Sequence, residues 1–356
     1  MIRRRFIKES AITDYTRREF LKISLAAAAA VKLAGCSLGS LPKDGRADAT
    51  SLPRRKLGRT GQDVTILGMG GAMLAVSAKG VLCPEPQTRE IVETALAGGV
   101  RYFDTSPDYK HSEERLGPAL AGWRDKIFLT TKTNNADRDK INEELSTSLK
   151  LLKTDHVDLL LLHCVGLTRE TRDPQAVLGK GGALETLLAA KRDGRTRFIG
   201  MSIHLPPVEG PLPENSATTT GIKLLESSDE WDVVMPWVNY IARAQIDAES
   251  RIVEPARKKG MGVVGMKVLG GDGQLADGYD RALRYTLSVP GVACAIIGVS
   301  DANQVRRALQ AARDFRPLTQ DEMVQTIALG KTLAATRSPK AMLLERHMGA
   351  DLGSTA

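Results

Sequence analysis

Four polar side chains at the ends of apolar runs could together move a proton to or from a carbonyl group. Asp104, Lys132 and His163 close the runs RYFD, IFLTTK and VDLLLLH, and Tyr109 follows shortly after Asp104. A phenol has a pKa near 10 and is a poor proton donor or base at neutral pH unless a neighbouring cation lowers its pKa. We expect Lys132 to supply that charge and Asp104 to hold its ammonium group protonated and oriented. His163 is expected to hydrogen-bond the carbonyl oxygen on which negative charge develops.

Each of the four residues also has a purely structural explanation. Asp104 could cap the turn that follows it, because aspartate commonly bonds nearby backbone groups. Lys132 could be a solvated strand end, Tyr109 could pack within its loop, and a lone histidine such as His163 is usually a buried core residue. Their joint placement at three successive strand ends favours the catalytic interpretation.

The elements that would position these groups form a repeating pattern from about residue 54 onward. Apolar runs alternate with helical patterns at 88–99, 142–152, 184–194 and 251–260, several of which end in glycine. Near-continuous apolar strands alternating with helices indicate a parallel sheet covered by helices. The predicted strands are 65–70, 101–104, 127–132, 157–163, 197–202, 233–237, 261–267 and 293–298.

Eight such units predict an α/β fold, a closed (β/α)8 TIM barrel, preceded by a short hairpin that turns at Thr60 and Gly61. An open doubly wound sheet is the competing interpretation. It would need a Gly-x-Gly-x-x-Gly turn that opens the first helix, whereas GMGGAM matches this pattern only in part and the loop 74–87 separates it from the next helix. In the barrel, reactive groups lie where strands end, on one face.

The segments GVRYFDTSPDYKHSEERLG, FLTTKT and LKLLKTDHVDLLLLH resemble the aldo-keto reductase family, and the similarity extends over about 56–311. The resemblance implies a catalytic tetrad of Asp104, Tyr109, Lys132 and His163. It also implies NADP(H) bound in an extended form across the barrel, and hydride transfer between nicotinamide and an aldehyde, ketone or alcohol carbon. The family also contains nucleotide-binding regulatory proteins with little turnover, such as the β subunits of potassium channels, which is the alternative function.

The cofactor contacts that the resemblance implies are only partly matched. The family holds the carboxamide with Ser-Asn and a Gln, whereas Ser202 is followed by Ile203 and Met235 stands where Gln is expected. These departures favour the regulatory alternative, and the intact tetrad opposes it.

The glycine-rich loop after 261–267 suits a pyrophosphate, or is an ordinary flexible loop. Arg307 could bind a 2′-phosphate, or lie on a solvated basic helix face. NADP(H) is therefore preferred and NAD(H) remains possible. The expected cofactor-binding residues are Gly70, Gly71, Ser202, Met266, Lys267, Val268, Gly270, Gly298, Gln304 and Arg307.

Other ligand classes find little support in the sequence. The histidines are scattered, without a His-x-x-x-His or Cys-x-x-Cys spacing, so we expect no metal site.

The net charge is +8, but eight basic and three acidic residues fall within the first 35 residues, which leaves +3 for the remainder. With aromatic residues at only 4%, a nucleic-acid partner is not expected. A sugar-binding or isomerase barrel would leave the tetrad unexplained. The expected partner is a small carbonyl compound or alcohol.

The stretch TRREFLKISLAAAAAVKLAGC, from Thr16 to Cys36, resembles an export signal. A twin arginine, a short apolar run and a small-residue processing site are typical of a signal peptide. TRREFLK resembles the signal of the Tat route, which moves folded proteins, and LAGC resembles a lipobox whose cysteine, Cys36, is lipidated. A frayed basic tail with a chance alanine run is the alternative. We expect a periplasmic or envelope protein that touches the membrane only through its lipid.

This pattern gives the predicted organisation of the whole chain. Residues 1–35 form the signal peptide, 36–53 the lipid anchor and flexible tether, 54–315 the barrel, and 316–356 a C-terminal helix and tail, with a helical pattern over 320–344. Cys164 and Cys294 lie in apolar runs and are interpreted as buried thiols, so no disulfide framework is expected.

Overall fold

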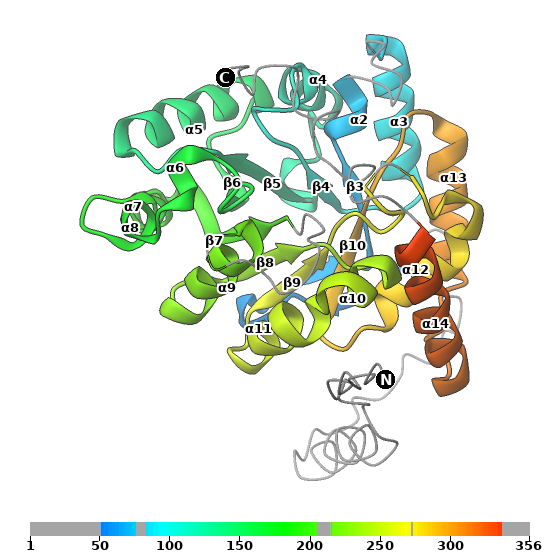
Figure 1. The fold of residues 1–356 in the computed structure, drawn as a ribbon. Coiled ribbons are helices and arrows are strands. Elements are labelled where there is room, and N and C mark those ends of the chain that lie inside the picture. Colours follow the sequence, from blue (N-terminus) through cyan, green and yellow to red (C-terminus); the bar gives the residue numbers. More distant parts are fainter. Residues whose placement is uncertain (1–50, 76–82, 205–213, 215, 272, 337–356) are drawn as a thin grey trace, which may run out of the picture. The chain divides into compact units, whose positions relative to one another are not determined.

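The computed structural model describes residues 51–75, 83–204, 214, 216–271 and 273–336. Parallel strands close into a barrel in the order β10-β3-β4-β5-β6-β7-β8-β9, with β9 paired to β10. The strands are β3 (Leu67–Gly70), β4 (Tyr102–Asp104), β5 (Phe128–Thr133), β6 (Val157–Leu162), β7 (Thr196–Ile203), β8 (Val233–Pro236), β9 (Gly262–Gly265) and β10 (Val292–Gly298). Helices surround them (Figure 1), so the predicted (β/α)8 barrel is confirmed.

Helical segments follow every strand of the barrel. After β3 to β6 come α2 (Ala72–Ala75), α3 (Glu85–Ala97), α4 (Ser112–Ala119), η2 (Arg124–Lys126), α5 (Arg138–Leu152), α6 (Arg169–Arg172), α7 (Pro174–Leu178) and α8 (Ala183–Arg192). After β7 to β10 come α9 (Ala217–Ser227), α10 (Tyr240–Ile246), η3 (Glu249–Val253), α11 (Glu254–Lys258), η4 (Ala276–Gly278), α12 (Tyr279–Ser288), α13 (Ala302–Arg313) and α14 (Gln320–Thr336).

Strand β6 shows why these sequences form a barrel wall. All of its residues are buried, because one side of the strand faces the barrel interior and the other faces the helices. Its one charged residue, Asp158, is fully paired. The carboxylate accepts hydrogen bonds from Arg124 Nη1 at 2.8 Å, Arg197 Nη1 at 2.6 Å and the backbone N–H of Leu129 at 2.8 Å. The Asp158 carboxylate therefore links β6 to the neighbouring strands β5 and β7 near the N-terminal end of the barrel.

The same end of the barrel is closed by a hairpin, formed by β1 (Arg54–Lys56) and β2 (Asp63–Thr65) around η1 (Gly58–Thr60). The side chain of Leu57 is buried against the start of β9, where a Cβ on Gly262 would lie 2.6 Å from Leu57 Cγ. Arg59 donates from its backbone N–H to Gly260 O and from its guanidinium to Trp231 O. With this end covered, the opposite, C-terminal end of the strands is the one left for chemistry.

The sequence predictions differ from the structure at several boundaries. Strand β9 ends at Gly265 rather than 267, because Lys267 has a φ of 56° and leaves the extended conformation. The predicted loop 166–182 contains the short helices α6 and α7. Leu52 is buried and Pro53 O accepts a hydrogen bond from Ile66 N, so residues just before 54 also pack against the barrel unit.

Several predictions lie outside the described residues. They are the signal peptide (1–35), Cys36, nearly all of the tether, and parts of the loops 74–87 and 205–217. The C-terminal helix is observed as α14 up to Thr336, whereas its predicted continuation to 344 lies outside. Within the ranges described, none of the helices is long and apolar enough to cross a bilayer.

Candidate active site

The structure brings the four predicted catalytic residues together at the C-terminal end of the barrel. Asp104 is the last residue of β4, Lys132 lies near the end of β5, and His163 follows directly after β6. Tyr109 lies in the segment between β4 and α4. These strands are neighbours in the barrel and run parallel, so their ends meet on one face.

Lys132 and Asp104 form a buried ion pair. Lys132 Nζ donates to Asp104 Oδ1 at 2.7 Å and to the carbonyl oxygen of Thr105 at 2.6 Å. Both side chains are almost fully shielded from solvent, with 1% and 5% of their surface exposed. Burial raises the pKa of the Asp104 carboxyl, and the charge of Lys132 opposes that shift. The pair therefore fixes the position of one ammonium group beneath the site.

Tyr109 is half-buried and its ring lies on that ammonium group. Lys132 Nζ is 4.7 Å from the centroid of the ring, in a cation–π contact, and the ring meets His163 edge-on at 5.8 Å. The net pKa shift of Tyr109 is opposite in direction to the predicted one. Desolvation, followed by the negative charge of Asp104, raises the pKa of Tyr109 well above its usual value. The ammonium group bonds Asp104 and Thr105 instead of the phenol, so Tyr109 holds its proton at neutral pH.

A carboxylate that the sequence reasoning missed orients His163. His163 Nδ1 lies 3.1 Å from Asp108 Oδ2 and 3.4 Å from Ser106 Oγ, and Asn134 Nδ2 donates to the same carboxylate. The sequence offers a signal for this role, because Asp108 directly precedes Tyr109 in the segment GVRYFDTSPDYKHSEERLG. Burial lowers the pKa of His163, and the hydrogen bond with Asp108 opposes this.

The partner of Nδ1 decides what the other ring nitrogen can do. A carboxylate accepts but does not donate, so it favours the proton on Nδ1 and leaves a lone pair on Nε2 of the neutral ring. His163 can then donate a hydrogen bond to a carbonyl oxygen from Nε2 only as an imidazolium. The expected role of His163 therefore depends on its protonation state.

Three more buried side chains, Cys164, His204 and Trp237, continue the site beyond His163. Cys164 Sγ lies 3.8 Å from His204 Nε2, and the His204 ring is 5.9 Å from those of His163 and Trp237. All these side chains are buried. Burial raises the pKa of Cys164 to about 12 and lowers that of His204 well below its usual value, so the thiol is protonated and the imidazole neutral at pH 7. Cys164 and Cys294 are free buried thiols, as predicted, whereas Trp237 had no signal in the sequence.

The predicted cofactor residues lie around the same end of the barrel. Gly70 and Gly298 end the paired strands β3 and β10. Gly71 N donates to Asp104 O at 2.7 Å, and a Cβ at Gly71 would approach Ser112 Oγ to 2.5 Å, so glycine is required there for packing.

Two expected cofactor groups are already engaged in other bonds. Ser202 Oγ accepts from Cys164 N at 2.9 Å. The side-chain amide of Gln304 bonds the backbone N–H and the hydroxyl of Ser300, both at 3.0 Å. Neither side chain is therefore fully available to a ligand in this arrangement.

The loop after β9 and helix α13 supply the remaining candidates. Met266 forms an isolated bridge with Trp237, Val268 is buried, and Lys267 is half-buried and interacts electrostatically with Lys132 and Asp104. Gly270 adopts a φ of 81°, which favours glycine. The Arg307 guanidinium lies 4.5 Å from the centre of the Tyr279 ring. Arg307 and Tyr279 border a hollow of about 480 Å³. Its other lining residues are Tyr240, Gln274, Leu275, Asp277, Gly278, Asp280, Arg281, Leu329 and Leu333.

Comparisons with known proteins agree with this geometry. A sequence profile of the Aldo/keto reductase family matches residues 67–282, more than half of the chain. Uncharacterized oxidoreductase YqkF of Bacillus subtilis is 26% identical over 311 residues, which cover 76% of this chain and 94% of YqkF. Methylglyoxal reductase DkgB of Salmonella typhimurium is 37% identical over 143 residues, which cover 38% of this chain and only 51% of DkgB.

Solved structures share the fold. Aldo-keto reductase AKR11C1 from Bacillus halodurans, in its holo form, superimposes with a TM-score of 0.62 at 23% sequence identity. The match covers 78% of this chain and 96% of AKR11C1.

Proposed function

The chain belongs to the aldo/keto reductase family and is an oxidoreductase, and we propose that it reduces a small aldehyde or ketone with NADP(H). The observation that carries this proposal is the buried pair of Lys132 and Asp104 beneath the ring of Tyr109. An ion pair buried at a strand end is costly to desolvate, and it places one positive charge against the ring of the phenol that would lose its proton.

The surrounding residues fit a nicotinamide dinucleotide, which when bound supplies a hydride from its ring. Asn134 Oδ1 and Trp237 Nε1 are buried without a hydrogen-bond partner among the residues described, so an acceptor and a donor are available near the tetrad. The positive φ of Gly270, the ammonium group of Lys267 and the guanidinium of Arg307 suit phosphate groups. The cation at Arg307 supports a preference for NADP(H) over NAD(H).

The proton in the proposed reaction comes from Tyr109. The phenol is protonated at neutral pH, because its pKa is raised, and it donates to the carbonyl oxygen only once that oxygen gains charge during hydride transfer. The phenolate that remains lies against the ammonium group of Lys132, which stabilises it, and Asp104 keeps that ammonium group in place. His163, oriented by Asp108, lies edge-on to the ring of Tyr109, within reach of the same reaction centre.

Turnover of carbonyl compounds tests the proposal. The full chain is mixed with NADPH or NADH and a panel of aldehydes and ketones that includes methylglyoxal, because relatives named methylglyoxal reductases match part of the chain. We expect loss of nicotinamide absorbance, faster with NADPH, and loss of this activity in Tyr109→Phe. Tight nucleotide binding without turnover of any carbonyl or alcohol would refute the catalytic function.

We also propose that the enzyme is exported with its cofactor already bound. The support is the sequence from Thr16 to Cys36, which resembles the signal of a route that moves folded proteins. Cell fractionation tests it, with Arg17 and Arg18 both changed to lysine as the comparison. The account requires the wild type in the envelope with nucleotide bound, and a cytoplasmic wild type would contradict it.

A further inference from the structure

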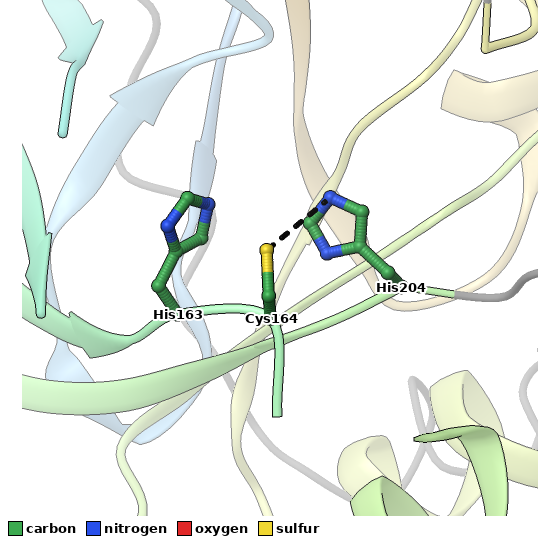
Figure 2. A group of neighbouring side chains, drawn as sticks. All are labelled: His163, Cys164 and His204. Atoms are coloured by element: carbon green, nitrogen blue, oxygen red, sulfur yellow. Dashed lines mark hydrogen bonds between the residues drawn. The ribbon is translucent and has the colours of Figure 1, made fainter. Parts of the chain in front are cut away.

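Three metal-ligating side chains, His163, Cys164 and His204, converge at the ends of β6 and β7 (Figure 2). One ligand atom from each lies within 4.8 Å of the other two, and all three residues are buried. We propose that this His–Cys–His cluster binds a thiolate-seeking cation of the Zn²⁺ type, and that the bound ion blocks turnover. The absence of a ligand spacing along the sequence does not bear on this, because two strands supply the residues.

The distances in the cluster are close to those of a tetrahedral zinc site. With Zn–S near 2.3 Å and Zn–N near 2.0 Å, ligand atoms of such a site lie about 3.3–3.6 Å apart. Cys164 Sγ and His204 Nε2 are 3.8 Å apart, and the widest separation in the cluster is below 4.8 Å. Side-chain shifts of about 1 Å would therefore close the site around an ion, with a water molecule as the fourth ligand.

The backbone at Cys164 is bent in a way that forms this cluster. Successive side chains of a strand point to opposite faces, so His163 and Cys164 would normally diverge. Cys164 instead has a φ of 48°, a conformation that is uncommon for a residue other than glycine. The bend is held by a hydrogen bond from Cys164 N to Ser202 Oγ at 2.9 Å. It turns the thiol toward His204 and beside His163 (Figure 2).

The surroundings of both imidazoles suit ligation. Asp108 occupies Nδ1 of His163, which leaves Nε2 for an ion, and a carboxylate behind a ligating histidine is the usual outer partner in zinc sites. His204 Nε2 already faces Cys164 Sγ, and His204 Nδ1 is buried and has no hydrogen-bond partner within the described part of the chain, so no competing bond holds this ring away from an ion. A buried polar atom without a partner is unusual in a protein that binds nothing there.

Local charges permit a cation despite two nearby ammonium groups. Lys132 and Lys267 act on Cys164 electrostatically, and the carboxylates of Asp104 and Asp108 offset their two charges. On binding, an S–metal bond replaces the S–H bond of Cys164 and the proton leaves to solvent. The thiolate then cancels one of the two charges of Zn²⁺.

Occupancy of this cluster would remove His163 from the reaction, because its Nε2 lone pair would be held by the ion. This part of the inference rests on the proposed reductase function. We therefore expect Zn²⁺ to inhibit carbonyl reduction reversibly, and a chelator to restore it.

Cobalt absorbance tests binding without relying on activity. The full chain carrying Cys36→Ser, which removes the cysteine outside the described residues, is titrated with Co²⁺. We expect a thiolate-to-cobalt band and tetrahedral d–d bands at one Co²⁺ per chain, both displaced by Zn²⁺. Cys164→Ala should abolish the thiolate band, whereas the matched control Cys294→Ala, at another buried cysteine, should keep it. Asp108→Asn should weaken binding about 10- to 100-fold.

The outcomes separate this inference from the proposed function. No thiolate band in the parent chain, or a band that survives in Cys164→Ala, would overturn the metal site whatever the activity. If Cys164→Ala does not fold, His204→Phe replaces it, with loss of the tetrahedral bands as the expected result. Cobalt binding in a chain that reduces no carbonyl would leave the site standing and remove only the inhibition.

Discussion

Replacing Lys132 by methionine is expected to destabilise the barrel as well as to stop turnover. Methionine keeps most of the apolar volume of the side chain and removes the charge. Asp104 then loses its 2.7 Å partner at Oδ1, and Oδ2 already has no hydrogen-bond partner among the described residues. The carbonyl oxygen of Thr105 loses its 2.6 Å donor as well.

The magnitude follows from the burial of the pair. Removing one member of a buried ion pair costs about 3–5 kcal/mol, because the other charge stays buried and uncompensated. Replacing both members by apolar residues is often close to neutral. Lys132→Met should therefore lower the free energy of unfolding by about 3–5 kcal/mol at pH 7, and Asp104→Leu/Lys132→Met should recover most of it. The loss should shrink at lower pH, because burial raises the pKa of Asp104 and a protonated Asp104 needs no partner.

Urea unfolding of both variants at two pH values provides the measurement, with Lys140→Met at an exposed position as the control. The control should change the free energy of unfolding by no more than about 0.5 kcal/mol. A loss below about 1 kcal/mol in Lys132→Met, or a double variant as unstable as the single one, would show that no uncompensated buried charge remains at Asp104. Neither variant should reduce carbonyls, so stability and activity should separate in the double variant.

Three further predictions concern the surroundings of the site and the last helix. Asp108→Asn removes the hydrogen bond that raises the pKa of His163, so the imidazolium is lost at lower pH and the alkaline limb of the kcat/KM profile should move to lower pH; an unmoved limb would show that Asp108 does not act through this ring. The pKa of Glu322 is lowered to about 2, chiefly by its hydrogen bond from Arg284, so its contribution to holding α14 is present above about pH 4.5 and is lost as the pH falls toward 2. Hydrogen exchange in α14 should rise over that window, and Glu322→Gln should remove this dependence. Gly330→Ala places a Cβ 2.0 Å from a backbone oxygen of α10, which should cost about 1–3 kcal/mol in thermal unfolding, and an unchanged Tm would contradict the packing.

The barrel and its tetrad could be predicted because both depend on the order of elements along the chain. In a parallel barrel the order of the strands alone brings their C-terminal ends to one face. The sequence therefore predicts that Asp104, Lys132 and His163 lie together there, without knowledge of any side-chain contact. Predicted strand ends were within a residue or two, since apolar runs mark the buried span but not the residue at which the backbone turns.

The remaining features of the site depend on side-chain packing and on single backbone torsions. Lys132 Nζ lies over the ring of Tyr109 because its two acceptors hold it there, and desolvation of the phenol reverses the expected pKa shift. The pairing of Cys164 with His204 depends on one positive φ that no pattern in the sequence indicates. The export signal and Cys36 stay predictions, because they lie outside the described residues.

Transfer of deuterium from labelled cofactor is the most direct test of hydride transfer by this chain. NADPH carrying deuterium at the hydride-donating carbon is incubated with the purified chain and methylglyoxal or another aldehyde, and the product is analysed by mass spectrometry. The account predicts deuterium on the former carbonyl carbon, with a rate about 10²- to 10⁴-fold lower in Tyr109→Phe, which lacks the proton donor. Product without deuterium, or Tyr109→Phe acting at the rate of the parent, would contradict it.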